Sequence, residues 1–138
     1  MQLSTRSRYG LRALMDISLN EADGPVLLRD IAARQNLSKS YTEQLLLTLQ
    51  TAGLVHGIRG KKGGFTLAKA PSEIRLIDVV TVLEGTFCLV DCVDNPEACP
   101  RIKGCPTQLL WRRLTTVLRD ELAQLTLHDL AGQKEISA

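Results

Sequence analysis

The chain has 138 residues, of which 44% are hydrophobic and 23% charged, and its formal net charge is +2. This composition is typical of one small globular domain, or of a small domain with an appendage. No apolar run approaches the roughly 18 residues that a membrane-spanning helix needs, and the short apolar stretch near the N-terminus is broken by Asp16 with no small-residue cleavage site after it. We therefore expect no membrane association and no secretion, and we expect the protein to act in the reducing cytoplasm.

The charge is divided unevenly along the chain. Residues 1–70 contain ten Lys and Arg against five acidic residues, whereas residues 71–138 contain seven against ten. A basic first half and a mildly acidic second half indicate that a polyanion meets the first half. A solvated surface gives the same asymmetry, so the charge alone does not decide.

Three helices are predicted in the first part of the chain. Apolar residues recur at helical spacing over residues 5–20 and again over 27–35. After the tight turn NLS, Ser38 is a suitable N-cap for a third helix that runs to about Ala52, and Gly53 stands where a glycine commonly ends a helix. Two short helices joined by a three-residue turn have the spacing of a helix-turn-helix.

A β-hairpin is predicted directly after these helices. Residues 54–58 and 65–68 have the pattern of two short strands, and the segment RGKKGG between them holds three glycines and three cations. Alone, this segment equally suits an exposed basic turn. Placed behind a helix-turn-helix, it is typical of the wing of a winged-helix protein.

Two further helices are predicted after Pro71. Residues 75–85 have a nearly continuous apolar face and end at Gly85. From Thr107 to about residue 125, another helix carries an apolar stripe made of Leu110, Leu114, Val117, Leu118, Leu122 and Leu125. Packing against the chain's own first helix and a dimer interface are both open explanations for this stripe.

These elements predict a mainly α fold with a small β-hairpin. We expect a winged helix-turn-helix DNA-binding domain over residues 1–70, followed by a linking helix and cysteine loop over residues 71–105. A long dimerisation helix with a C-terminal tail is expected over residues 106–138.

The third predicted helix has an inward and an outward side. Three leucines are spaced to point inward: Leu45, Leu46 and Leu49. Four side chains are then left outward near the N-terminal end, the end that faces base edges in helix-turn-helix proteins: Ser40, Tyr41, Glu43 and Gln44. A glutamine can pair with adenine, a carboxylate can accept from cytosine, and the neighbouring Lys39 suits a phosphate. A solvated helix face would present the same residue types.

The cations of the predicted wing suit two different DNA contacts. Arg59 is suited to a narrow minor groove, and Lys61 and Lys62 are suited to the phosphate backbone. Several such contacts per dimer would make DNA binding steeply dependent on salt.

All four cysteines lie in one short segment, CLVDCVDNPEACPRIKGC, over residues 88–105. Prolines and a glycine interrupt this segment, so it cannot form one regular element. In a reducing compartment, clustered cysteines indicate metal ligands or sensors ahead of disulfides. The chain has no C-x-x-C pair, no phosphate-binding loop and no clustered Ser, His and Asp set. An enzyme is therefore not expected.

Three segments resemble the Rrf family of bacterial winged-helix transcriptional regulators: LSTRSRYGLRALMDISLN, LLRDIAARQNLSKSYTEQLLLTLQTAGLV and IRGKKGGFTLAK. The resemblance covers nearly the whole chain, including LWRRL and LTLHDL in the C-terminal part. It implies a homodimer that binds a pseudo-palindromic operator in double-stranded DNA, in the simplest case as a repressor. The family's base-reading positions fall on Ser40, Tyr41 and Glu43, and its minor-groove arginine falls on Arg59.

The resemblance also implies a role for the cysteines as ligands of an iron–sulfur cluster. Family members of the IscR and NsrR kind hold an iron–sulfur cluster with three cysteines before the dimerisation helix. Cys92, Cys99 and Cys105 occupy that region with the spacing C-x6-C-x5-C, one residue longer in the first gap than is usual. This implies a cluster, with [2Fe-2S] favoured over [4Fe-4S], that senses iron–sulfur status, redox state or nitric oxide. Zinc and no metal stay open, because spacing does not name a metal.

A cluster-free alternative comes from family members of the CymR kind. Such a regulator would act through DNA and partner proteins without a metal. The three cysteines would then have no part in regulation.

The resemblance leaves the fourth cluster ligand unassigned. IscR-like members place a histidine three residues after the last cysteine, where this chain has Gln108, and NsrR-like members use an aspartate of the partner's first helix, where this chain has Arg8. Cys88 and the Gln108 amide remain candidates. The apolar neighbours of Cys88 suit a buried structural cysteine equally well.

Overall fold

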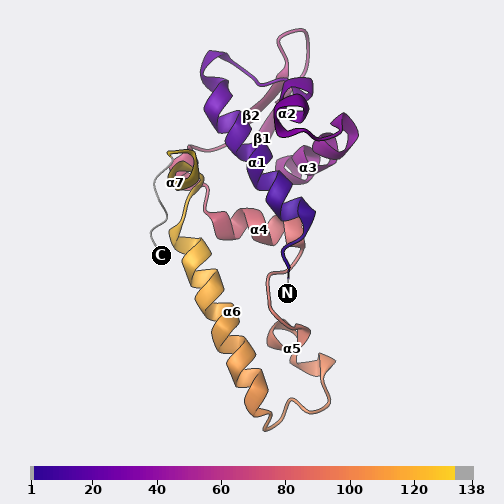
Figure 1. Ribbon diagram of the computed structural model, residues 1–138, viewed down its shortest axis with the longest axis vertical. Helices are drawn as coiled ribbons and strands as arrows, with labels where there is room; N and C mark the ends of the chain where they lie inside the picture. Colours follow the sequence, from indigo (N-terminus) through magenta and orange to yellow (C-terminus); the bar gives the residue numbers. More distant parts are fainter. Residues whose placement is uncertain (1, 133–138) are drawn as a thin grey trace.

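Figure 1 shows the computed structural model, in which a helical body carries a long helical arm. The described residues are 2–132. The body contains α1 (Thr5–Asn20), α2 (Leu28–Gln35), α3 (Lys39–Thr51), β1 (Val55–Ile58), β2 (Gly64–Leu67), α4 (Leu76–Glu84) and α7 (Leu127–Ala131). The arm contains α5 (Asp91–Asp94) and α6 (Pro106–Gln124). Short 3-10 turns occur at Glu21–Asp23, Pro71–Glu73 and Pro96–Ala98. The predicted mainly α fold with one hairpin is confirmed.

The helix-turn-helix forms at the predicted place because its ends are satisfied locally. Asn36 has a left-handed backbone (φ 56°), and its N–H donates to the last carbonyls of α2. The Ser38 hydroxyl then accepts from the backbone N–H of Tyr41 at 3.1 Å and so begins α3. Gly53, with φ 79°, follows the end of this helix. The predicted capping residues are therefore confirmed.

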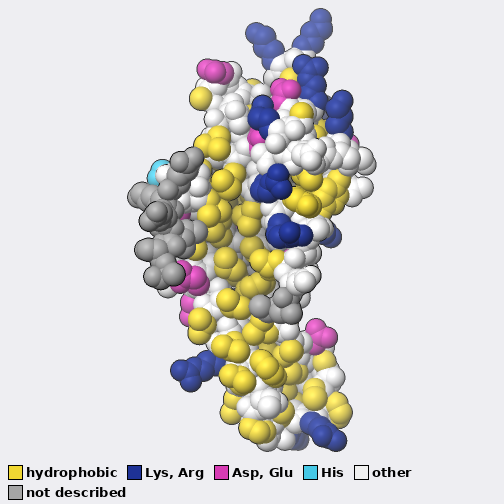
Figure 2. Space-filling model, viewed as in Figure 1, with side chains coloured by type: hydrophobic (Ala, Val, Ile, Leu, Met, Phe, Trp, Pro, Cys, Tyr) yellow, Lys and Arg dark blue, Asp and Glu magenta, His cyan; other side chains and the backbone are white. Residues whose placement is uncertain are grey.

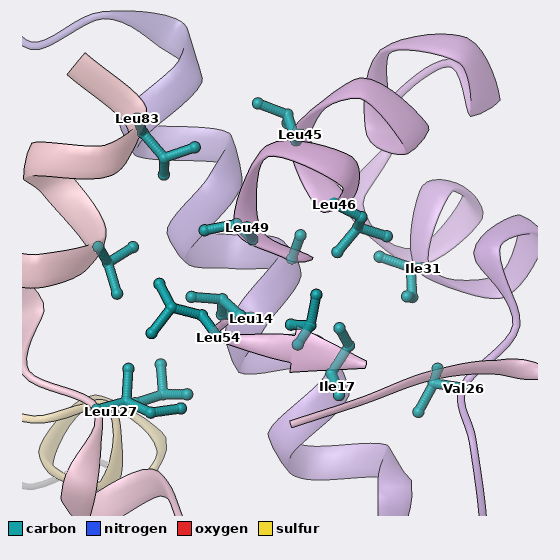
Figure 3. Close-up of a cluster of buried hydrophobic side chains, with 14 residues drawn as sticks. Leu14, Ile17, Val26, Ile31, Leu45, Leu46, Leu49, Leu54, Leu83 and Leu127 are labelled. Carbon is teal, nitrogen blue, oxygen red and sulfur yellow. The ribbon is translucent and has the colours of Figure 1, made fainter. Parts of the chain in front are cut away.

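The core lies where α1, α2, α3, α4 and α7 meet (Figure 3). Its fully buried large side chains include Leu14, Ile17, Ile31, Leu45, Leu46, Leu49, Leu83 and Leu127. Removing each such side chain from water stabilises the fold by about 1.5–3 kcal/mol. Gly10 belongs to this packing, because a Cβ there would collide with the Leu83 side chain. The absence of a side chain at this position allows α1 and α4 to approach closely.

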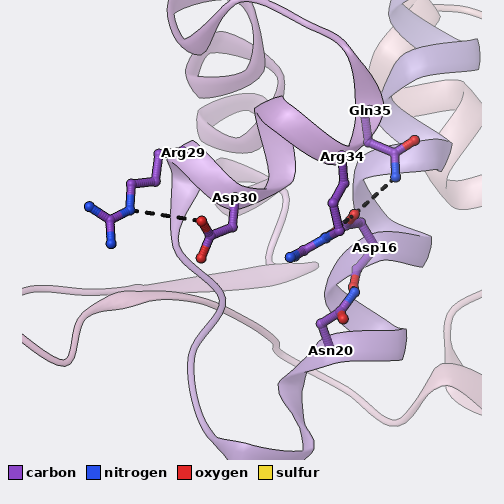
Figure 4. A network of polar contacts seen from close by, with 6 residues as sticks. All are labelled: Asp16, Asn20, Arg29, Asp30, Arg34 and Gln35. Atoms are coloured by element: carbon purple, nitrogen blue, oxygen red, sulfur yellow. Dashed lines mark hydrogen bonds and ion pairs between the residues drawn. The ribbon is translucent and has the colours of Figure 1, made fainter.

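A buried carboxylate joins α1 to α2 (Figure 4). Asp16 is only 3% exposed, and it accepts two short hydrogen bonds from Arg34, 2.9 Å from Nε and 2.7 Å from Nη2. The amide of Gln35 donates to the same carboxylate at 2.9 Å. Hydrogen bonding to Asp16 raises the pKa of Arg34. A buried charge is tolerated only with such partners. The network therefore fixes the position of the C-terminal end of α2 against α1.

The hairpin is antiparallel, with Val55 opposite Leu67 and Ile58 opposite Gly64. Val26 extends it on the other side, exchanging both backbone hydrogen bonds with Phe65 at 2.8 and 2.9 Å. Gly64 has φ 140°, and a Cβ there would meet the Val26 carbonyl. A glycine is thus required where the wing returns to the body.

The chain after α6 turns back to the body, which the sequence did not predict. Leu76 N–H donates to the Leu125 carbonyl and Leu127 N–H to the Ile74 carbonyl, both at 2.9 Å. Thr126 and Asp129 then form a capping box that begins α7. These contacts place the fully buried Leu127 against α1. Residues 133–138 of the expected C-terminal tail lie outside the described residues.

The long helix α6 does not pack along α1, which was one of the two explanations for its apolar stripe. It lies against α4 and α5 instead. Its most buried side chains are polar: Gln108 (4% exposed) and Thr115 (1%). Much of its apolar surface is open between residues 109 and 117, through Leu109, Leu110, Leu114 and Val117 at 40–62% exposure. Figure 2 shows hydrophobic side chains gathered over this arm.

Candidate DNA-binding surface and cysteine loop

The inward and outward sides of α3 are as predicted. Its three leucines, Leu45, Leu46 and Leu49, are buried. Among the expected DNA contacts, Tyr41 is half-buried and the others are exposed: Lys39, Ser40, Glu43 and Gln44. Because α3 is held by its buried leucines and by its cap, the backbone positions that carry these side chains are fixed relative to the core.

The wing and α3 share one surface hollow. Glu43, Leu47 and Gln50 of α3 line it on one side, and Arg59 with the neighbouring hairpin backbone lines it on the other. The remaining wing cations, Lys61 and Lys62, are exposed in the turn beyond. Figure 2 shows Lys and Arg side chains projecting from the end of the molecule where this turn lies. The structure thus brings Glu43 and Arg59 to the same site and keeps the lysines farther out.

A second hollow lies on the other side of α3, and the sequence reasoning did not identify it. Arg6 of α1 lines it together with Tyr41, Gln44 and Thr48 of α3. The signal available in the sequence was the group of arginines in the first helix, at positions 6, 8 and 12. The outward face of α3 is therefore flanked by Arg59 on the wing side and by Arg6 on the α1 side.

The four cysteines are half-buried free thiols in the loop between α4 and α6. Cys92 is in α5, Cys99 follows the 3-10 turn at Pro96–Ala98, and Cys105 is the N-cap residue of α6. Within residues 2–132, no three or more His, Cys, Asp or Glu side chains are grouped closely enough to hold a metal. The three thiols suit a soft metal or an iron–sulfur cluster by their chemistry. In this geometry, however, binding requires the loop to close around the group.

Two of the thiols have opposite electrostatic environments. A hydrogen bond with Thr107 (Sγ to Oγ1, 3.1 Å) and the backbone N–H of Gln108 lower the pKa of Cys105. Burial, followed by the nearby Asp94 carboxylate, raises the pKa of Cys88. The thiolate that a metal needs is therefore favoured at Cys105 and disfavoured at Cys88.

The other candidate for a fourth ligand is Gln108, and the two histidines of the chain lie elsewhere. Gln108 is buried, and its amide lies 3.5 Å from the Cys92 carbonyl oxygen, so it faces the loop. His56 is an exposed residue of β1, and His128 is an exposed residue of α7. Neither histidine belongs to the cysteine loop.

The first half of the cysteine loop is anchored to α6. Arg119 donates from Nε to the Phe87 carbonyl and from Nη2 to Asp94, both at 2.7 Å. The hydroxyl of the buried Thr115 accepts from the backbone N–H of Leu89 at 3.2 Å. The side of α6 that carries Thr115 and Arg119 thus holds the loop, while Leu109, Leu110, Leu114 and Val117 stay exposed.

A helix-turn-helix with a basic wing, next to a long helix with an open apolar face, defines a winged-helix transcriptional regulator. The chain belongs to the Rrf2 family, whose model, described as an iron-dependent transcriptional regulator, matches residues 3–133. It is a regulator and not an enzyme, as predicted. Within residues 2–132, no helix has the length and apolar character needed to cross a membrane.

Curated relatives bear different names within this family. The chain is 38% identical to protein rrf2 of Nitratidesulfovibrio vulgaris, over 94% of this chain and 87% of that protein. It is 38% identical to the regulator IscR of Erwinia tasmaniensis, over 99% and 82%. It is also 37% identical to the regulator CymR of Bacillus subtilis, over 96% and 91%.

Two of the similar solved structures bear the names CymR and IscR. CymR of B. subtilis, described as the global cysteine regulator of that organism, superimposes with a TM-score of 0.81 at 34% identity, covering 98% of this chain and 99% of that one. IscR of T. potens superimposes with a TM-score of 0.78 at 33% identity, covering 100% and 92%. The chain is similar to both kinds of regulator to nearly the same degree.

Proposed function

We propose that the chain binds a pseudo-palindromic operator in double-stranded DNA as a homodimer, in the cytoplasm, and represses transcription there. The observation that carries this proposal is the hollow that Glu43 of α3 shares with Arg59 of the wing. A helix that lies in the major groove needs base-reading side chains on its outer face and a cation beside it for the backbone or the minor groove. This surface offers both.

The outward side chains of α3 have distinct roles in this proposal. Gln44 can pair with adenine, and Glu43 can accept from the amino group of cytosine, which compensates its repulsion by phosphates. Ser40 and Tyr41 contact bases or sugar oxygens beside them. Lys39 binds a phosphate near the N-terminus of the helix.

The wing contributes contacts to the next groove. Arg59 enters the minor groove where that groove is narrow and strongly negative. Lys61 and Lys62, farther out in the turn, bind phosphates and add affinity that does not depend on sequence.

Dimerisation is proposed through the open face of α6. Thr115 and Arg119 of this helix hold the cysteine loop, whereas Leu109, Leu110, Leu114 and Val117 are exposed. Covering apolar surface contributes about 25 cal/mol per Å², so a second copy of this helix is a favourable cover. A two-fold dimer also places two copies of α3 on half-sites about one helical turn apart.

The cysteine loop is proposed to regulate this dimer by holding an iron–sulfur cluster on Cys92, Cys99 and Cys105. When bound, such a cluster would supply a centre that is sensitive to oxidants, nitric oxide and iron supply. The protein itself would transmit the presence of the cluster through a change in the conformation of the loop. Cys92 lies in the loop half anchored to α6, and Cys105 begins α6, so gathering the thiols changes the start of the proposed dimerisation helix. DNA affinity then changes by linkage.

A cluster-free regulator of the CymR kind is the second candidate. The observation that favours it is the spread of the thiols, which are not gathered into a metal site within residues 2–132. In this case the protein would bind its operator and partner proteins with the loop as it stands.

The experiment that tests the DNA proposal is selection of binding sequences from a random duplex pool, followed by affinity measurements on the selected site. Glu43→Gln and Arg59→Ala are the informative variants, and Lys69→Gln, exposed and away from both hollows, is the control. We expect a two-fold symmetric site, with Glu43→Gln changing the preferred base at one position per half-site. Recovery of no preferred sequence would contradict the proposal.

A further inference from the structure

The hollow between α1 and α3 has the same construction as the hollow at the wing. On the wing side, Arg59 faces Glu43, Leu47 and Gln50. On the α1 side, Arg6 faces Tyr41, Gln44 and Thr48. Each hollow therefore joins outward side chains of α3 to one arginine from another element. In the major groove, a recognition helix has a phosphate backbone along each of its two sides.

The cations of α1 form no close ion pair within the part of the chain that is described. Over residues 2–132, no ion pair joins Arg6, Arg8 or Arg12 to a carboxylate. Arg6 and Arg8 lie in the first turn of α1, which contains no acidic residue and where the helix dipole disfavours cations. Arg6 is close enough to Glu84 to help lower the pKa of that carboxylate, but no ion pair joins the two side chains, and the carboxylate accepts its hydrogen bonds from Ser7 and Ser4. The Arg6 guanidinium, which has no close ion-pair partner among these residues, is therefore available to an external anion.

The position of this turn relative to α3 is fixed by two tyrosines. Tyr9 and Tyr41 meet edge to face, with ring centroids 6.2 Å apart. The Tyr41 hydroxyl lies 3.3 Å from the Thr5 hydroxyl, which joins the same two helices. Arg8 and Arg12 lie over the Tyr9 ring, with guanidinium carbons 5.6 and 5.3 Å from its centroid. Arg6 is therefore carried on a rigid turn beside the outer face of α3.

We propose that Arg6 binds a phosphate of duplex DNA on the side of α3 opposite the wing. Arg8 and Arg12 strengthen the positive potential there without being required to touch the DNA. This inference rests on the proposed function, because it assumes that α3 lies in the major groove. It adds a DNA contact from α1, so that cations contact the DNA on both sides of α3: Arg59 on the wing side and Arg6 on the α1 side.

The test is the salt dependence of binding to two duplexes, the selected site and a scrambled duplex of the same length, using full-length protein. Each phosphate contact contributes about 0.9 to the slope of log affinity against log salt concentration. We expect Arg6→Gln to lower this slope by about two per dimer and to weaken both duplexes by the same factor, roughly tenfold or more. Arg6→Lys should keep most of the slope, and the control Lys69→Gln should leave it unchanged.

Three other results have definite meanings. An unchanged slope in Arg6→Gln, with a thermal unfolding midpoint like that of wild type, would overturn the inference while leaving the proposed function standing. Loss of dimer in Arg6→Gln by sedimentation would also overturn it, since Arg6 would then contact a second copy of the chain. Failure of the wild-type protein to bind either duplex at low salt would instead overturn the proposed function itself.

Discussion

Replacing Glu84 with Gln tests how the first turn of α1 is attached to the body. The carboxylate of Glu84, at the end of α4, accepts hydrogen bonds from the backbone N–H and the hydroxyl of Ser4 at 2.9 and 2.7 Å, and another from the Ser7 hydroxyl. These hydrogen bonds, that of Ser7 first, lower the pKa of Glu84. A glutamine keeps one acceptor oxygen but loses the charge that strengthens all three bonds.

The expected loss is modest and depends on pH. Charge-assisted hydrogen bonds are roughly twice as strong as neutral ones, so Glu84→Gln should lower the free energy of unfolding by about 1–2 kcal/mol at pH 7. Because the pKa of Glu84 is lowered by folding, its contribution is present above the unfolded value of about 4.3 and is lost as the pH falls through the folded value. Below that point, wild type and variant should have nearly the same stability.

Urea denaturation of both proteins between pH 7 and pH 3 measures this difference directly. Glu121→Gln, which removes an exposed carboxylate of α6, is the matched control and should have little effect at any pH. A Glu84→Gln protein as stable as wild type at pH 7 would refute the reasoning. So would a deficit that stays undiminished at pH 3.

Three further perturbations test the fold and the surface. Leu46→Ala removes a fully buried side chain from the core and should lower the free energy of unfolding by about 2–5 kcal/mol in urea. Gly64→Ala places a Cβ against the Val26 carbonyl at φ 140° and should lower the midpoint of thermal unfolding, whereas Gly60→Ala, which meets no neighbouring atom, should cost less. Arg59→Ala should weaken operator binding about tenfold in fluorescence anisotropy while leaving the melting temperature within a degree or two, since Arg59 is exposed.

The sequence predicted those elements whose signals are local. Ser38 as a cap, Gly53 after the end of a helix, and the glycines and cations of the wing turn each act within a few residues, so their effect is visible without the fold. The burial of Leu45, Leu46 and Leu49 followed from helical spacing alone. Helix α7 was missed although the capping pair Thr126 and Asp129 was present, because five residues carry too little periodicity.

Features that depend on contacts between distant residues were not predictable. The partnership of Asp16 with Arg34 joins two helices, and neither residue alone indicates a buried pair. Likewise, the apolar stripe in the sequence of α6 does not predict which face of the helix is buried by the rest of the chain. In the structure it is Gln108 and Thr115 that are buried, because the cysteine loop needs hydrogen-bond partners there.

The similarity to both IscR and CymR regulators leaves the cysteine loop as the feature that distinguishes the two candidate functions. Cys88→Ala is the useful control for any experiment on this loop. The pKa of the Cys88 thiol is raised, which disfavours its thiolate. The pKa of Cys105, the N-cap residue of α6, is lowered, which favours its thiolate. A regulatory site made of Cys92, Cys99 and Cys105 should tolerate Cys88→Ala and should not tolerate the loss of the other three.

The most direct measurement is operator affinity of protein purified without oxygen, before and after treatment with an iron chelator, with the visible spectrum and the iron and sulfide content recorded on the same samples. We expect coloured protein containing iron and sulfide, and a change in operator affinity of tenfold or more when the colour is lost. The variant with Ala at Cys92, Cys99 and Cys105 should be colourless and should not respond to the chelator. A colourless wild-type protein that lacks iron and sulfide, with the same operator affinity as that triple variant, would contradict this expectation.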